Sequence, residues 1–268
     1  MEAPNQLDAP DWKREKELFD LVIQMGELIL VNGGEIYRAH ETMEYAARNF
    51  GLTGFQDFII ANGIFASIIA EGHVYSTQIR WIPLVPTELC RVEAVNELSR
   101  EVAEGRCTPE ELREKLQSVK TMRASGEGLR ILASGFGAAS FCYLFQGTWA
   151  DTAVAFGAGI TLYWFLLKVL HRISLPKIME TILSSAVSSL FCLFAFQLGF
   201  GDDLNHMILG AIFPLVPGVP LTNAVRNLLE NDYLSGLVRL ADALLTAGCI
   251  AIGVGMVLTL GRLLGGGF

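Results

Sequence analysis

The chain has few charged residues. Only 18% of its 268 residues are Asp, Glu, Lys or Arg, whereas an ordinary soluble domain has about 25%. The hydrophobic fraction is 51% and the mean hydropathy is +0.41. A basic excess is also missing, because the net charge is -8, so the positive surface that nucleic-acid binding requires is not expected. The composition predicts a protein that lies partly in a lipid bilayer and has no nucleic-acid partner.

Signatures of metal sites and of enzymes are lacking as well. The five cysteines show no CxxC or Cys/His ligand spacing, and the four histidines are scattered; we interpret the cysteines as packing residues. The chain contains no GxSxG, HExxH or GxxxxGK[ST] pattern, and no GxGxxG after a strand, which argues against several enzyme classes. We therefore expect no catalytic residue, no metal and no cofactor.

The charges that are present gather in the first half. Residues 1–130 hold 14 Lys/Arg and 21 Asp/Glu, and residues 131–268 hold 6 and 7. The first residues, MEAPNQLDAPDWKREKEL, lack the charged-then-apolar layout of a secretory signal, so we expect this half to stay in the cytoplasm. Residues 1–124 are predicted to form a cytosolic domain.

Helical periodicity and turn signals indicate that this domain is α+β. Helical segments are expected at residues 12–31, 35–50 and 88–104, and from TPEELREKLQ onward, where Thr108 and Glu111 fit a capping box. Between them, FQDFIIANGIFASIIAEGHVYSTQIRWI is rich in β-branched and aromatic residues, and Asn62-Gly63 and Glu71-Gly72-His73 break it. That stretch predicts two or three antiparallel strands.

From residue 125 onward the sequence predicts an α-helical integral membrane domain. A helix needs about 20 apolar residues to cross roughly 30 Å of hydrocarbon. Five runs qualify, near residues 128–146, 151–170, 180–200, 206–226 and 236–260. The expected fold is therefore about five transmembrane helices, the fourth broken by Pro and Gly, behind an N-terminal α+β cytosolic domain.

Loop charges orient these spans. The connection between the second and third runs carries Lys168, Arg172 and Lys177, and the first-to-second and third-to-fourth connections carry neither Lys nor Arg. Positively charged loops stay on the cytoplasmic side. The N-terminus is therefore predicted in the cytoplasm and the C-terminus in the periplasm.

Residues 210–233, GAIFPLVPGVPLTNAVRNLLENDY, include most of the fourth run and have prolines at 214, 217 and 220, so this stretch cannot be an unbroken helix. It is either a kinked helix covered by its neighbours or a discontinuous helix whose free backbone groups line a polar cavity. On the second interpretation Gly218 allows close backbone approach, and the ends of the half-helices attract an anion. The predicted substrate-binding residues are Pro217, Gly218, Pro220, Thr222, Asn223 and Arg226.

Two further polar features fall inside spans. Arg239 and Asp242 are three residues apart and so share a helix face; they are either an interfacial arginine with its partner or a proton-coupling pair. Ser184 and Ser188 lie on one ridge of the third span. They either let helices pack closely or line a polar pathway.

Several of these motifs resemble the threonine/serine exporter family. The segments are NGGEIYRAHETM, ANGIFASI, AVNELSR and, above all, PLVPGVPLTNAVRNLLENDYLSGLVRLADALLTA. The resemblance covers nearly the whole chain and corresponds to the N-terminal module of the family. Full-length members add a second block of spans that this chain lacks, so the chain resembles the split form.

The resemblance implies what the protein does and with what. Full-length members export small amino acids, and the split pair exports succinate, so we expect a secondary exporter of small carboxylates in the bacterial inner membrane, driven by the proton gradient. A small YjjB-like membrane subunit is the expected partner, with a homo-oligomer of the pair as a further possibility. Two alternatives stay open on the residues alone: a membrane-tethered hydrolase and a metabolite-sensing regulatory membrane protein.

Overall fold

The computed structural model describes residues 9–70, 73–83, 88–122, 126–173 and 175–263. Its backbone contacts divide into two compact units. The first, called the sheet unit, comprises Met1–Ala124 together with Asn223–Val238, and the second, called the bundle unit, comprises Ser125–Thr222 and Arg239–Phe268. The predicted boundary between residues 124 and 125 lies outside the described residues. The division adds to the N-terminal part a short segment that the hydropathy pattern assigned to the membrane part.

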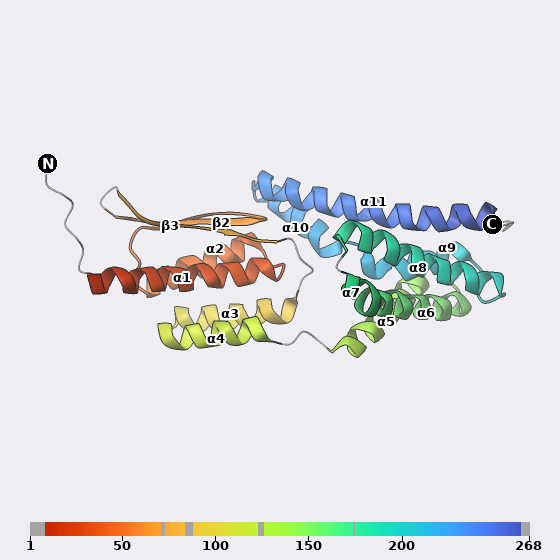
Figure 1. Ribbon diagram of the computed structural model, residues 1–268, viewed down its shortest axis with the longest axis horizontal. Helices are drawn as coiled ribbons and strands as arrows, with labels where there is room; N and C mark the ends of the chain where they lie inside the picture. The colour runs from red at the N-terminus through yellow and green to blue at the C-terminus, as the bar shows by residue number, and fades with distance from the viewer. Residues whose placement is uncertain (1–8, 71–72, 84–87, 123–125, 174, 264–268) are drawn as a thin grey trace. The chain divides into compact units, whose positions relative to one another are not determined.

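The sheet unit has three layers (Figure 1). A three-stranded antiparallel sheet has the order β1-β2-β3, and its strands are Phe55–Ile60, Gly63–Ala70 and His73–Trp81. Helices α1 (Ala9–Val31) and α2 (Ile36–Asn49) pack on this sheet, and α3 (Leu89–Ala103) and α4 (Pro109–Thr121) pack on those two helices. The core between the layers contains the fully buried Phe19, Ile23, Ile29, Met43, Ile64 and Leu112.

Local signals in the sequence account for these element ends. Gly33 has φ +79° and its amide donates to the Leu30 carbonyl, which ends α1 at the Gly-Gly pair as predicted. Thr108 and Glu111 form the expected capping box at α4, with Thr108 N–H to Glu111 Oε2 at 3.0 Å and Glu111 N–H to Thr108 Oγ1 at 3.3 Å. The Asn62-Gly63 turn joins β1 to β2. The other predicted turn falls on residues 71–72, outside the described residues.

The bundle unit is helical. Helix α5 is Glu127–Leu144, and α6 (Trp149–Phe165) continues as the π-helix η1 (Leu166–Leu170) into the short α7 (His171–Ile173). Then follow α8 (Lys177–Gln197), α9 (Leu204–Ile212) and the 3-10 turn η2 (Phe213–Leu215). Helix α10 (Gly218–Leu229) begins in the bundle unit and ends in the sheet unit. Helix α11 (Tyr233–Leu263) begins in the sheet unit and ends in the bundle unit.

Small residues let the helices of the bundle approach closely. A Cβ built on Gly159 of α6 would lie 2.7 Å from the Ser134 carbonyl oxygen of α5, and one on Gly210 of α9 would lie 2.7 Å from the Ala138 carbonyl oxygen. The Ser134 hydroxyl donates to the Gly159 carbonyl at 2.9 Å. Small-residue contacts of this kind are typical of helix packing in membranes.

Among the described residues, three helices are long and apolar enough to cross a membrane: Trp149–Leu170, Lys177–Gln197 and Tyr233–Leu263. The count rises to four if the bent pair Leu204–Leu215 and Gly218–Leu229 is one span. Helix α5, which corresponds to the first predicted span, has 18 residues and is not among them. The chain is thus mostly helical with three to four candidate spans, and the count of five stays a prediction.

Candidate transport site

The interruption that the prolines predict is present in the backbone. Helix α9 tightens into η2, Val216 is extended with ψ 127°, and α10 starts at Gly218, so the two helical stretches are bent by 64°. Pro217 lies in the break, where its carbonyl accepts from the Leu221 amide at 3.1 Å. Pro220 lies in the first turn of α10, where a missing amide hydrogen costs little.

Around Gly218 the described chain leaves open space. A Cβ built there would meet nothing within 4 Å, so the close backbone approach expected at this glycine does not come from a neighbouring helix of this chain. The Thr222 hydroxyl donates within its own helix, to the carbonyls of Gly218 at 3.1 Å and Val219 at 3.0 Å. Asn223, one residue further on, is half-buried. A ligand or partner contact at the break stays a prediction.

Arg226, a further residue of the predicted site, has a carboxylate partner. Its guanidinium forms an ion pair with Glu35, and both residues belong to the sheet unit. The residues of the break as far as Thr222 belong to the bundle unit. The pair with Glu35 balances the Arg226 charge within the sheet unit, and a joint anion site of Arg226 with the first turn of α10 stays a prediction.

The polar ridges of α8 lie inside the bundle. Ser184, Ser185, Ser188 and Ser189 have no exposed surface, and the Ser188 hydroxyl donates to the Ala211 carbonyl of α9 at 3.4 Å. A Cβ on Gly253 of α11 would lie 2.0 Å from Ser185 Oγ. These contacts favour close helix packing over a wet pathway wall, although the Ser184 and Ser189 hydroxyls have no hydrogen-bond partner within the described part of the chain.

Asp242 has a cationic partner that the sequence did not predict. The Lys177 ammonium, on the first residue of α8, lies 2.8 Å from each carboxylate oxygen of Asp242. Arg239 is buried, with 8% of its surface exposed. The Asp242 carboxylate therefore joins α11 to α8, and a pair of Arg239 with Asp242 stays a prediction. Helical spacing could not reveal the contact with Lys177, since Lys177 and Asp242 are 65 positions apart.

One buried carboxylate of the bundle unit was not predicted. Asp151, in the first turn of α6, is fully buried; its Oδ1 accepts from the Asp202 and Asp203 amides at 2.7 and 3.1 Å, and its Oδ2 from the Thr148 amide at 2.9 Å. Thr148 and Asp151 form a capping box. The pattern Thr-x-x-Asp before an apolar run was the available signal. Because its oxygens are hydrogen-bonded, Asp151 fixes the loop that precedes α9.

The chain is similar in sequence to proteins of a transporter family. A family model described as "Putative threonine/serine exporter" matches residues 20–261. The Klebsiella aerogenes protein named "Probable succinate transporter subunit YjjP" is 25% identical over 261 residues, which cover 95% of this chain and 98% of that protein. The Escherichia coli K12 protein of the same name is 24% identical over 258 residues, covering 94% and 98%.

A longer relative also matches. The Mycobacterium tuberculosis H37Rv protein named "Probable threonine/serine exporter" is 25% identical over 244 residues, which cover 89% of this chain but 45% of that protein. No solved structure matches the chain.

Proposed function

Because the chain belongs to the threonine/serine exporter family, we propose that it is a membrane subunit of a secondary exporter for small carboxylates. The observation that carries the proposal is the end-to-end match to proteins named succinate transporter subunits, which this chain covers over 98% of their length. A dicarboxylate such as succinate is the first substrate to test. Threonine and serine are the second, since a longer relative is named for them.

The proposed location is the bacterial inner membrane. The long apolar helices of the bundle unit support a membrane protein, and the Lys168, Arg172 and Lys177 charges between the second and third predicted spans favour a cytoplasmic position for that loop. On this basis the N-terminus is cytoplasmic and the C-terminus periplasmic. The sheet unit is then the cytosolic part of the exporter.

The proposed substrate site is the break between η2 and α10. Pro217, Gly218 and Pro220 interrupt the helix, and the amides at the start of α10 present a positive dipole end that suits a substrate carboxylate. Thr222 and Asn223 follow in α10. Of the two predicted serines of α8, Ser184 has a hydroxyl with no partner among the described residues and could serve a substrate, whereas the Ser188 hydroxyl donates to the Ala211 carbonyl. The open space beside Gly218 supports a contact made by substrate or by another subunit.

A second subunit is part of the proposal. The matched relatives are named subunits, which implies that they work with a partner. We propose a small YjjB-like membrane protein in that role, with the pair itself free to form a homo-oligomer, and the proton gradient as the driving force.

Everted membrane vesicles test the proposal. With this chain and its partner both present, energised vesicles are expected to accumulate labelled succinate, and an uncoupler is expected to release it. A gradient of one pH unit supplies about 1.4 kcal/mol per proton, so one coupled proton supports about tenfold accumulation. Vesicles with either subunit alone are the control. Equal uptake with and without the chain would refute an exporter function. Uptake of threonine without uptake of succinate would show that the substrate is an amino acid.

Substitution of Gly218 tests the break. Gly218→Leu is expected to leave expression and melting temperature unchanged, because its side chain meets open space in this chain, and to reduce succinate uptake at least about tenfold by filling the space that a substrate needs. Gly248→Leu is the matched control, since a Cβ on Gly248 also meets nothing within 4 Å. Normal succinate uptake by a well-expressed Gly218→Leu protein would show that the break does not bind the substrate.

A further inference from the structure

The segment that follows Asn223 is anchored within the sheet unit. Arg226 pairs with Glu35 at the start of α2, and the Ala61 amide, at the β1–β2 turn, donates to the Ser235 hydroxyl at 3.1 Å. Ser235 is fully buried. These contacts hold residues 226–235 against α2 and β1, and all of these residues belong to the sheet unit.

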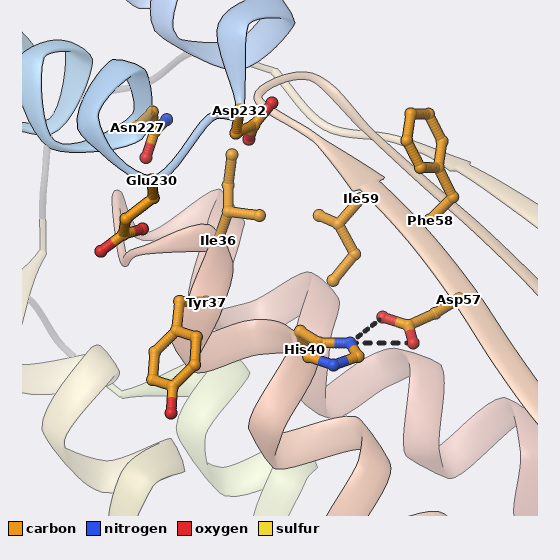
Figure 2. A pocket seen from close by; sticks show the side chains of 9 residues that line it. All are labelled: Ile36, Tyr37, His40, Asp57, Phe58, Ile59, Asn227, Glu230 and Asp232. Atoms are coloured by element: carbon orange, nitrogen blue, oxygen red, sulfur yellow. Dashed lines mark hydrogen bonds and ion pairs between the residues drawn. The ribbon is translucent and has the colours of Figure 1, made fainter.

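A pocket of about 460 Å³ lies between these three elements, within the usual size range of small-molecule sites. Ile36, Tyr37 and His40 of α2 line one side, and β1 lines a second side through Asp57 and Ile59 (Figure 2). Asn227, Glu230 and Asp232 close the third side. Phe58, also on β1, belongs to the lining as well, so the apolar wall consists of the two isoleucines, Phe58 and the Tyr37 ring.

The lining is acidic. It contains three carboxylates, Asp57, Glu230 and Asp232, and His40 is its one residue that can carry a positive charge. The His40 Nδ1 atom lies 2.9 Å from each Asp57 oxygen, so even a protonated His40 offsets Asp57 alone. The pocket therefore keeps a negative charge, which favours a cationic ligand. The apolar residues beside these carboxylates favour an organic cation, and among the described residues no group of three or more His, Cys, Asp or Glu could hold a metal ion.

A buried amide points independently to a ligand. Asn227 is 5% exposed, and its Nδ2 atom has no hydrogen-bond partner in the described part of the chain. An unpaired buried donor is costly to leave unsatisfied. Since Asn227 lines the pocket, a ligand oxygen there could accept this hydrogen bond.

We infer that this pocket is a binding site for a small organic amine that carries an apolar body, a primary ammonium group and a neighbouring oxygen acceptor. The ammonium group faces Glu230 and Asp232, the oxygen accepts from Asn227, and the apolar body covers Ile36, Ile59 and the Tyr37 ring. None of the lining residues belongs to the proposed site at the break, and the inference does not depend on the proposed export. A dianion such as succinate is expected not to bind here.

Three probes of one shape test the charge. They share a phenyl ring and a hydroxyl group: 2-amino-1-phenylethanol carries an ammonium group, 1-phenyl-1,2-ethanediol a second hydroxyl in its place, and mandelate a carboxylate. Binding to the full chain in nanodiscs is measured by saturation-transfer NMR titration. The amino alcohol is expected to bind at least about tenfold more tightly than the diol, because it pairs with carboxylates, and mandelate is expected not to bind. Equal affinity of all three, or a preference for mandelate, would overturn the inference.

Matched variants separate the pocket from partition into lipid. Glu230→Gln is expected to weaken binding of the amino alcohol about two- to fivefold, which is the effect of losing one partly exposed charge pair. Glu114→Gln makes the same change on the exposed surface of α4 in the same unit and is expected to have no effect. If the two variants behave alike, the amine does not bind in this pocket.

The role of the Asn227 amide is tested by changing first the ligand and then the protein. 2-Phenylethylamine lacks the hydroxyl group and is expected to bind more weakly than the amino alcohol to the natural protein. Asn227→Ala is expected to bring the two ligands to the same affinity, because the donor for that oxygen is gone, and its melting temperature shows whether the variant folds. If the amino alcohol and 2-phenylethylamine bind to the natural protein with equal affinity, Asn227 does not contact the ligand oxygen and the proposed ligand chemistry is wrong. This outcome can be measured even if Asn227→Ala cannot be purified.

Discussion

Gly253→Ala is expected to destabilise the bundle unit, whereas Gly255→Ala in the same helix is expected to leave it as stable or more stable. A Cβ on Gly253 would lie 2.0 Å from Ser185 Oγ and 2.5 Å from the Ile182 carbonyl oxygen. The hydroxyl can rotate, but the carbonyl belongs to the backbone of α8. The new methyl group therefore has to move α11 away from α8.

The expected size of this effect follows from overpacking. An extra methyl group in a well-packed interior costs about 1–3 kcal/mol, and separating the helices also weakens the contacts on either side of Gly253. At Gly255 a Cβ meets nothing within 4 Å, so the substitution only replaces glycine by the better helix former, worth about 1 kcal/mol or less.

Thermal melting of both variants in the same detergent measures the difference. Gly253→Ala should melt well below the natural protein, and Gly255→Ala at the same temperature or above it. A double variant, Gly253→Ala with Ser185→Gly, keeps most of the loss if the backbone carbonyl is the obstacle. Equal melting temperatures for the two single variants would mean that α8 and α11 do not pack through Gly253.

Local patterns in the sequence predicted the elements well, because the signals are themselves local. Proline removes an amide hydrogen wherever it stands, so the break at residues 214–220 could be foreseen and is present. The capping box at Thr108 and Glu111 needs only a spacing of three, and both of its hydrogen bonds form.

The contacts that define the candidate sites are not local. Ser235 meets Ala61 across 174 positions, and Arg226 meets Glu35 from a different part of the chain. Residues 223–238, which join the fourth predicted span to the fifth, were counted with the membrane part, whereas the backbone contacts group them with the N-terminal part. The pocket depends on that grouping, and neither His40 nor Asp57 carried a sequence signal for it.

The same limit explains Asp242. Helical spacing placed Arg239 on the face of Asp242, but it could not reveal the contact with Lys177, which depends on how α8 packs beside α11. The side chain of Lys177 is 51% exposed and that of Asp242 25%, and an exposed ion pair of this kind contributes at most about 1 kcal/mol to stability. Stability alone therefore gives little reason for a lysine and an aspartate at these two positions.

We propose instead that Asp242 couples export to the proton gradient, by alternating between the ion pair with Lys177 and a protonated state. Asp242→Asn is then expected to keep the fold, with a melting temperature within a few degrees of the natural protein. In energised everted vesicles its succinate accumulation should fall from about tenfold, the ratio that one proton supports across one pH unit, to about one. Succinate should still equilibrate across the vesicle membrane through the variant, and an uncoupler should no longer change its distribution.

Two variants separate coupling from a structural role. Glu180→Gln makes the same chemical change in the first turn of α8 and is expected to retain accumulation. Lys177→Gln combined with Asp242→Asn removes both charges, so a structural pair predicts that the double variant regains whatever Asp242→Asn loses. A coupling carboxylate predicts that accumulation stays near one in the double variant, because no group is left to carry the proton. Accumulation restored in the double variant, with its natural pH profile, would show that the proton crosses elsewhere, and the second subunit would be the next place to look.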